Sequence, residues 1–155
     1  MINVLFVCHG NICRSPMAEF VMKELVKQAG REREFCIASA ATSTEELGNP
    51  VYPPARRKLA EHGIRCDGHH ARQLTSRDYA DYDLLIGMDH ANLCNMQRIC
   101  GGDPAGKLHL LLDYTARPGA VADPWYTGDF EVTWRDVLAG CQGLLAQLTG
   151  EHADV

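Results

Sequence analysis

A cysteine and an arginine separated by five residues form the strongest chemical signal in this sequence. The segment from Cys8 to Arg14 follows a short apolar run and leads into Ser15 and Pro16, a pair typical of a helix start. A turn between a strand and a helix can aim backbone N–H groups and the positive helix end at one point, where an anion binds. Such a field favours the thiolate of a cysteine, which is a nucleophile. The pattern therefore predicts covalent chemistry by Cys8 on a bound anion.

Each residue type in this turn suits a phosphoryl group. Gly10 and Asn11 tolerate the left-handed backbone angles that direct successive N–H groups inward. The planar guanidinium of Arg14 can bind two phosphoryl oxygens at once. Ser15 can cap the helix and donate a hydrogen bond to the sulfur of Cys8, which would help that sulfur leave. We expect phosphate to be bound by His9, Gly10, Asn11, Ile12, Cys13, Arg14 and Ser15.

The sequence holds a second cysteine and arginine with the same separation, Cys66 and Arg72. A polar stretch precedes Cys66, and Gln73 follows Arg72, so neither a buried strand nor a helix cap borders this copy. We therefore expect Cys66 to be a structural thiol.

Strands and helices alternate along the chain in a way that would position the turn. Apolar runs predict strands at residues 2–7, 35–40, 82–88 and 108–112. Helical spacing predicts helices from Ser15 to before Gly30 and at residues 55–62, 89–100 and 130–148, the last with Trp134 and Cys141 in the core. This alternation predicts one α/β domain over residues 1–155, a Rossmann-like three-layer α/β/α fold around a parallel sheet of about four strands. The turn after the first strand lies at the edge where such sheets bind ligands, and the long loop through residues 117–125 is the second segment expected to carry function.

Composition excludes several classes of protein. The chain has 155 residues, a net charge of -5 and seven cysteines. The acidic balance argues against nucleic-acid binding, and the first apolar run is too short to span a membrane. An odd number of scattered cysteines indicates free thiols in a reducing compartment, so we expect a cytoplasmic protein. No Cys-x-x-Cys or His-x3-His pattern occurs, which predicts no metal, and we expect no cofactor.

The turn resembles the signature of the low-molecular-weight protein tyrosine phosphatase family, C-x-G-N-x-C-R-S, which appears here from Cys8 to Ser15. The similarity continues in order along nearly the whole chain, for example at Ser39-Ala40-Ala41, Gly48-Asn49-Pro50, Tyr82-Asp83-Leu84 and Met88-Asp89. It implies hydrolysis of phosphotyrosine monoesters through a phosphocysteine on Cys8, with Arg14 binding the phosphoryl group. It also implies phosphotyrosine-containing partner proteins, among them a tyrosine kinase or its substrates, and we expect a monomer or weak homodimer.

The resemblance also selects the general acid. A tyrosyl oxygen leaves poorly at neutral pH unless it is protonated. The family's acid lies in an Asp-Pro-aromatic-aromatic loop, which Asp123-Pro124-Trp125-Tyr126 matches and Asp103-Pro104-Ala105-Gly106 does not. Asp123 is therefore expected to be the acid and then the base. Trp125 and Tyr126 would form one wall of the substrate pocket, and alignment places Glu45, followed by Glu46, on the opposite wall.

Two further roles follow from the same residue-by-residue comparison. Relatives can join the cysteines equivalent to Cys8 and Cys13 in a disulfide that protects the nucleophile, so a redox pair is expected here. The family also has a hydrogen-bonded network that supports the loop from beneath, and the positions that match it here are Asn11, Ser15, Ser39 and His69. His70 stays open as an alternative to His69.

Three alternatives stay open. Thioredoxin-coupled arsenate reductases resemble this loop and use two more cysteines, for which Cys94 and Cys100 are candidates. A second alternative is a phosphoarginine phosphatase. Members of the family with that activity have a similar loop, with threonine at the position of Ile12. A phosphate- or phosphotyrosine-binding module without turnover would need no acid such as Asp123.

Overall fold

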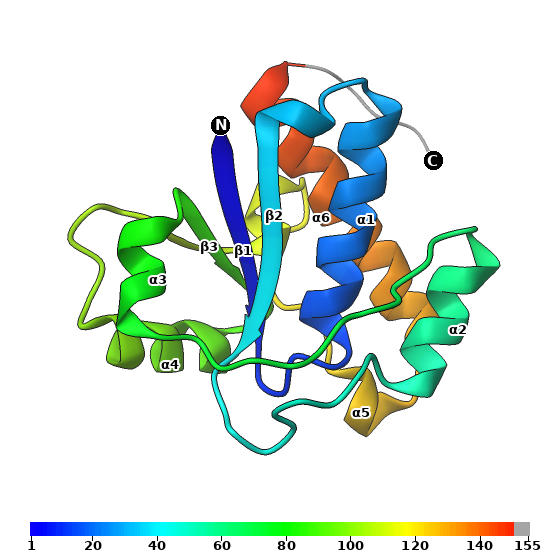
Figure 1. The fold of residues 1–155 in the computed structure, drawn as a ribbon, viewed down its shortest axis with the longest axis horizontal. Helices are drawn as coiled ribbons and strands as arrows, with labels where there is room; N and C mark the ends of the chain where they lie inside the picture. The colour runs from blue at the N-terminus through cyan, green and yellow to red at the C-terminus, as the bar shows by residue number, and fades with distance from the viewer. Residues whose placement is uncertain (151–155) are drawn as a thin grey trace.

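A four-stranded parallel sheet lies at the centre of the computed structural model, which describes residues 1–150 (Figure 1). The strands lie in the order β2-β1-β3-β4, and every neighbouring pair is parallel. The predicted Rossmann-like α/β fold is confirmed, while residues 151–155 of the predicted domain lie outside the described residues. The strands are β1 (Ile2–Cys8), β2 (Phe35–Ala41), β3 (Leu84–Gly87) and β4 (Leu108–Leu110).

Helices cover both faces of this sheet, which gives the three layers seen in Figure 1. One face carries α1 (Arg14–Gln28), α2 (Pro53–Glu61) and α6 (Phe130–Thr149), and the other carries α3 (Ser76–Asp81) and α4 (His90–Cys100). The short α5 (Pro124–Thr127) lies near the carboxyl ends of the strands, and two 3-10 helices are η1 (Glu32–Glu34) and η2 (Leu111–Tyr114). Among residues 1–150, no helix combines the length and apolarity that crossing a bilayer requires.

The alternation of side chains along β1 explains why this strand is central. Val4 and Phe6 face the core formed with α1 and α6, whereas Leu5 and Val7 face the core on the side of α4, and all four are fully buried. A strand covered on both faces needs a continuous apolar run, which is what the sequence provides before Cys8. The buried positions of Trp134 and Cys141 confirm their predicted place in the core.

The predicted N-cap of α1, Ser15, is wrong by two residues. The helix begins at Arg14, and Cys13 occupies the N-cap position without a side-chain cap. Ser15 lies within the first turn, and its hydroxyl bonds to Cys8 and Asn11 instead of capping the helix. The chain is therefore already helical at the arginine that ends the predicted phosphate loop.

Other predicted boundaries differ from the structure where a turn or short helix replaces residues that the hydrophobic pattern assigns to a strand. The strand predicted at residues 82–88 is shorter, because Tyr82 ends α3, a helix that the sequence analysis missed. Thr75 and Asp78 form a capping box at its start, a signal that is present in the sequence. The strand predicted at residues 108–112 ends at Leu110 and continues as η2, and the predicted loop at residues 117–125 ends in α5.

Two glycines allow α6 to approach η2 closely. A Cβ atom on Gly140 would overlap the side chain of Leu111, and one on Gly143 would overlap the carbonyl oxygen of Tyr114. The chain after Tyr114 runs to Val121, whose N–H donates to the carbonyl of Met88 over 2.9 Å. This packing therefore holds the start of the segment that leads to Asp123.

We predict that Gly143→Ala destabilises the protein, although alanine favours a helix by about 1 kcal/mol relative to glycine. A backbone oxygen cannot move aside as a flexible side chain can, so overpacking should lower the free energy of unfolding by about 1–3 kcal/mol. Urea unfolding measures the change, with Gln147→Ala on the exposed face of the same helix as control, expected within about 0.5 kcal/mol. A Gly143→Ala protein as stable as the wild type would contradict this packing.

Candidate active site

The sulfur of Cys8 lies inside the loop that joins β1 to α1. The backbone N–H groups of Asn11 and Ser15 point at Sγ over 3.3 Å and 3.5 Å. Asn11 has a φ of 60°, the left-handed value expected for this position, and no other non-glycine residue among those described has a positive φ. The loop thus aims two backbone N–H donors at the sulfur at the end of β1.

The hydroxyl of Ser15 is a third polar group at the sulfur of Cys8, and the side chain of Asn11 contacts it. The side-chain amide of Asn11 donates to Oγ of Ser15 over 2.8 Å. Oγ lies 3.0 Å from Sγ of Cys8, and its own proton is then available to the sulfur. When Cys8 is a thiolate it has no proton to give, so Ser15 is then the donor to the sulfur, and Asn11 orients its hydroxyl.

Asn11 is itself held from behind the loop. Its Oδ1 accepts the backbone N–H of Arg72 over 3.2 Å, and its carbonyl accepts Nε2 of His69 over 2.8 Å. His70 instead contacts the carbonyl of Gly48 at the surface. Of the two histidines left open by the sequence, His69 is the one that lies beneath the loop.

Glu19 connects the remaining network residue, Ser39, to this support. The hydroxyl of Ser39 donates to Oε1 of Glu19 over 2.5 Å, and the same oxygen lies 4.0 Å from Nδ1 of His69. Lys23 pairs with the other oxygen of Glu19. Among residues 1–150, the hydroxyl of Ser39 is therefore linked to the loop through Glu19 and His69.

Arg14 is buried, with three acceptors around its guanidinium. Nη1 donates to Asp89 over 2.7 Å and to the carbonyl of Val121 over 2.9 Å, and Nη2 donates to Asp123 over 3.4 Å. Burial works against the charged form, but the negative charge of Cys8, the bond to Asp89 and the charge of Asp123 raise the pKa of Arg14 above its usual value. These contacts use three of its five N–H donors. Nε–H and the second Nη2–H, on one edge of the guanidinium, stay available for an anion.

The loop that carries Asp123 forms one side of the pocket. Oδ1 of Asp123 caps α5 by accepting the N–H of Trp125 over 3.0 Å, while Oδ2 faces Arg14. Trp125 packs on Tyr52, with ring centroids 4.9 Å apart, and is 53% exposed, whereas Tyr126 is 84% exposed. Both aromatic residues line the mouth of the pocket, and the wall that they form is open to solvent.

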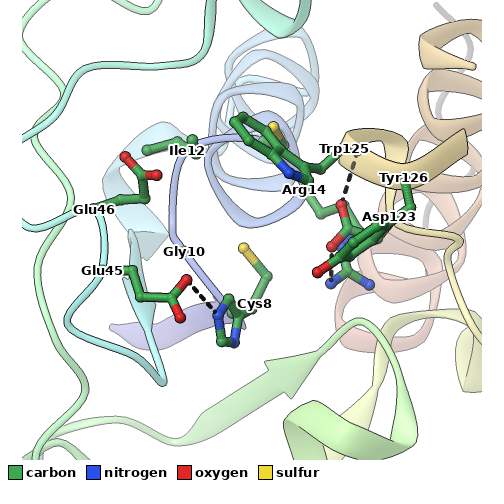
Figure 2. Close-up of a pocket in the computed structure, with 11 residues that line it drawn as sticks. Cys8, Gly10, Ile12, Arg14, Glu45, Glu46, Asp123, Trp125 and Tyr126 are labelled. Carbon is green, nitrogen blue, oxygen red and sulfur yellow. Dashed lines mark hydrogen bonds and ion pairs between the residues drawn. The ribbon is translucent and has the colours of Figure 1, made fainter. Parts of the chain in front are cut away.

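The opposite side carries three charged or titratable side chains. Nε2 of His9 lies 3.0 Å from Oε2 of Glu45, and Glu46 accepts the side-chain amide of Asn49 over 2.6 Å. Figure 2 shows Cys8 between this side and the loop with Asp123 and Trp125. The cavity between them has a volume of about 120 Å³, and both glutamates line it.

Cys13 lines the same cavity as Cys8, and both thiols are free. Burial raises the pKa of Cys13 to about 12; the negative charges of Cys8 and Asp123 add to this, and Arg14 opposes it. A thiol with such a pKa is protonated at neutral pH, so Cys13 is a poor nucleophile there.

The predicted site residues fall into two groups. The cavity is lined by Cys8, His9, Gly10, Ile12, Cys13, Arg14, Glu45, Asp123, Trp125 and Tyr126. Behind the loop lie Asn11, Ser15, Ser39 and His69.

Two carboxylates at the site, the half-buried Asp89 and the buried Glu19, were not among the predicted site residues. Asp89 lies two residues after the end of β3, at the same sheet edge as Cys8, and this position in the sequence was a usable signal. Glu19 lies one helical turn after Ser15, and only the fold brings it to Ser39 and His69. The second cysteine and arginine with the same separation have structural roles. Cys66 is buried, and Nη1 and Nη2 of Arg72 donate to the carboxylate of Asp78 over 3.0 Å and 3.2 Å.

Comparison with known proteins gives a consistent result. The sequence profile described as low molecular weight phosphotyrosine protein phosphatase matches residues 3–154. The low molecular weight protein-tyrosine-phosphatase YfkJ of Bacillus subtilis (strain 168) is 39% identical over 153 residues, which cover 97% of this chain and 98% of that protein. The low molecular weight phosphotyrosine protein phosphatase of Rattus norvegicus is 39% identical over 148 residues, 92% of this chain and 93% of that protein. The crystal structure of YfkJ from Bacillus subtilis has a TM-score of 0.93 at 38% identity, over 97% of this chain and 96% of that one.

Proposed function

Because the chain belongs to the low molecular weight phosphotyrosine protein phosphatases, we propose that it hydrolyses phosphotyrosine monoesters through a phosphocysteine on Cys8. One observation carries this proposal: Sγ of Cys8 faces the N–H groups of Asn11 and Ser15 and the hydroxyl of Ser15. Donors aimed at a sulfur favour its anionic, nucleophilic form. Phosphotyrosine-containing proteins are the proposed substrates, and a partner tyrosine kinase and a cytoplasmic location stay predictions.

In the first step the thiolate of Cys8 attacks phosphorus, and the bond from phosphorus to the tyrosyl oxygen breaks. Arg14 binds the phosphoryl oxygens with Nε–H and Nη2–H, the two donors that its protein contacts leave available. Asp123 in its protonated form gives its proton to the departing tyrosyl oxygen. Asp89 and Val121 act as positioning groups, since they fix the plane of the guanidinium.

In the second step water attacks the phosphocysteine. Asp123, now a carboxylate, removes a proton from the water, and the bond from sulfur to phosphorus breaks. The proton of Ser15 stabilises the departing thiolate, and Asn11 keeps the hydroxyl in that orientation. Inorganic phosphate then leaves, and Cys8 is restored.

The alternative functions find less support in the geometry. Cys94 is exposed on α4 and Cys100 is half-buried, and neither lines the cavity that contains Cys8. Arsenate reduction with these two thiols is therefore not proposed. Ile12 lines the cavity as an apolar side chain, which suits a phenyl ring. A binding module without turnover would not need Asp123 beside Arg14.

We predict that Cys8→Ser nearly abolishes hydrolysis of aryl phosphates in the presence of EDTA. Asp123→Ala should lower kcat by about 100-fold or more for phenyl phosphate, and the loss should shrink as the leaving phenol becomes more acidic. Steady-state kinetics over a series of substituted phenyl phosphates measures this dependence.

Asp123→Asn is the matched control for the structural role of Asp123, because asparagine can still cap α5. It should show the same dependence on the leaving group as Asp123→Ala. An Asp123→Asn enzyme with wild-type activity would reduce Asp123 to a helix cap and remove it from the mechanism.

We also propose that hydrogen peroxide joins Cys8 and Cys13. The thiolate of Cys8 attacks a peroxide oxygen, the O–O bond breaks, and a sulfenic acid and a hydroxide ion form. The sulfur of Cys13 then attacks the sulfur of Cys8, and the sulfenic hydroxyl leaves as water with the thiol proton of Cys13, which gives the disulfide. Because the pKa of Cys13 is raised to about 12, its thiolate fraction grows about tenfold per pH unit below that value. The yield of bridge relative to Cys8 sulfinic acid should rise from about pH 6 to about pH 8.

Peptide mapping after mild peroxide treatment measures this ratio, and Cys13→Ser serves as the variant that cannot form the bridge. Wild-type protein with sulfinic acid on Cys8 and a reduced Cys13 at every pH would refute the redox pair.

A further prediction concerns charge at the pocket mouth. Glu45 is exposed, and it should repel acidic side chains directly beside phosphotyrosine. Glu45→Gln should raise kcat/KM for such peptides about two- to fivefold at low ionic strength, and salt should reduce the effect. Glu32→Gln makes the same charge change in η1 and should have no effect. Wild-type enzyme that prefers acidic residues at these adjacent positions would disprove a repulsive rim.

A further inference from the structure

A groove next to the catalytic pocket has no role in the proposed mechanism. It has a volume of about 510 Å³, and Ile12 and Glu46 line both the groove and the pocket. Pro50, the buried Val51 and Pro53 give it apolar walls. The groove and the pocket are therefore neighbours on one side of the phosphate loop and share the wall formed by Ile12 and Glu46.

The groove is fixed rigidly to this loop. The backbone N–H of Tyr52 donates to the carbonyl of Ile12 over 2.9 Å. The ring of Tyr52 packs between Trp125 and Phe130, with centroids 4.9 Å and 6.2 Å away. Prolines on both sides of Val51 and Tyr52 limit the backbone further. A ligand in the groove would therefore meet a preformed surface in register with the pocket.

Charge changes sign along the groove. Glu46 lies at the end shared with the pocket, and α2 contributes the exposed Arg56 and Arg57. Arg56 pairs with Asp67 over 2.7 Å. Arg57 has no acidic partner among residues 1–150, so its charge is free for a ligand. An acidic group that binds there would gain an ion pair without breaking one.

We propose that this groove binds the polypeptide segment that flanks phosphotyrosine, with an apolar side chain over Val51 and an acidic side chain paired with Arg57. The inference rests on the proposed phosphatase function, because phosphotyrosine in the pocket brings its neighbouring residues to the shared boundary at Ile12 and Glu46. Residues directly beside phosphotyrosine meet the glutamates of the mouth, and residues farther along the chain meet the arginine. The groove thus selects acidic residues at a distance from phosphotyrosine, where the mouth does not repel them.

The test compares phosphopeptides that differ only in an aspartate or alanine placed two, three or four residues from phosphotyrosine, on either side. In wild-type enzyme, aspartate at one of these positions should raise kcat/KM about two- to fivefold at low salt. Arg57→Glu should abolish or reverse this preference, and Arg57→Lys should keep most of it. Replacing an apolar residue between aspartate and phosphotyrosine by asparagine should also lower kcat/KM in wild-type enzyme.

Arg33→Glu is the matched control, because Arg33 is exposed in η1, which precedes β2 at the amino ends of the strands, away from the phosphate loop at their carboxyl ends. The change in net charge is the same. It should keep the preference for aspartate. Hydrolysis of p-nitrophenyl phosphate should be unchanged in all three arginine variants, since this ester does not reach the groove.

Several results would overturn the groove as a subsite. These are a wild-type enzyme indifferent to aspartate at every position, an Arg33→Glu enzyme that loses the preference equally, or an Arg57→Glu enzyme that loses p-nitrophenyl phosphate hydrolysis to the same extent. Failure of the phosphatase function looks different, because a Cys8→Ser enzyme would then still hydrolyse p-nitrophenyl phosphate.

Discussion

The placement of one sulfur among the hydrogen-bond donors of its loop is the constraint on which the site depends. Asn11 must adopt a left-handed backbone angle so that its N–H turns toward Cys8, and its side chain must hold Ser15 in place. A left-handed backbone angle at a residue other than glycine costs free energy, and a short loop does not keep this conformation without contacts from the surrounding structure. The backbone of Arg72 and the ring of His69 provide that support from outside the loop.

The sheet explains how such distant segments meet. The parallel strands β1, β2 and β3 end with Cys8, Ala41 and Gly87 at the same edge of the sheet. The loop that follows β1 therefore lies between the segments that follow β2 and β3. Asp89 and Val121 reach Arg14 from this edge, and the N–H of Val121 is in turn fixed by the carbonyl of Met88. The guanidinium is thus oriented by segments that lie far apart in the sequence.

Much of the fold and of the phosphate loop could be predicted from the sequence, because the sequence pattern is strong where a single segment determines its own structure. The apolar run before Cys8, the glycine and asparagine of the loop and the spacing along α6 each predict their element directly. The predicted start of α1 is wrong because the sequence suggests two roles for the hydroxyl of Ser15, and the structure shows its contact with the sulfur but not the helix cap. Glu19 could not be assigned from the sequence, since its partners come from β2 and from the segment before Arg72.

The proposed chemistry depends on Cys8 becoming covalently attached to phosphorus during turnover. Rapid acid quenching of the enzyme with an aryl phosphate, followed by mass spectrometry of its peptides, tests this most directly. Phosphate should be found on the sulfur of Cys8 and on no other side chain. Phosphate on a different residue, or turnover with no phosphoenzyme at any quench time, would contradict the role of the sulfur at the centre of the loop.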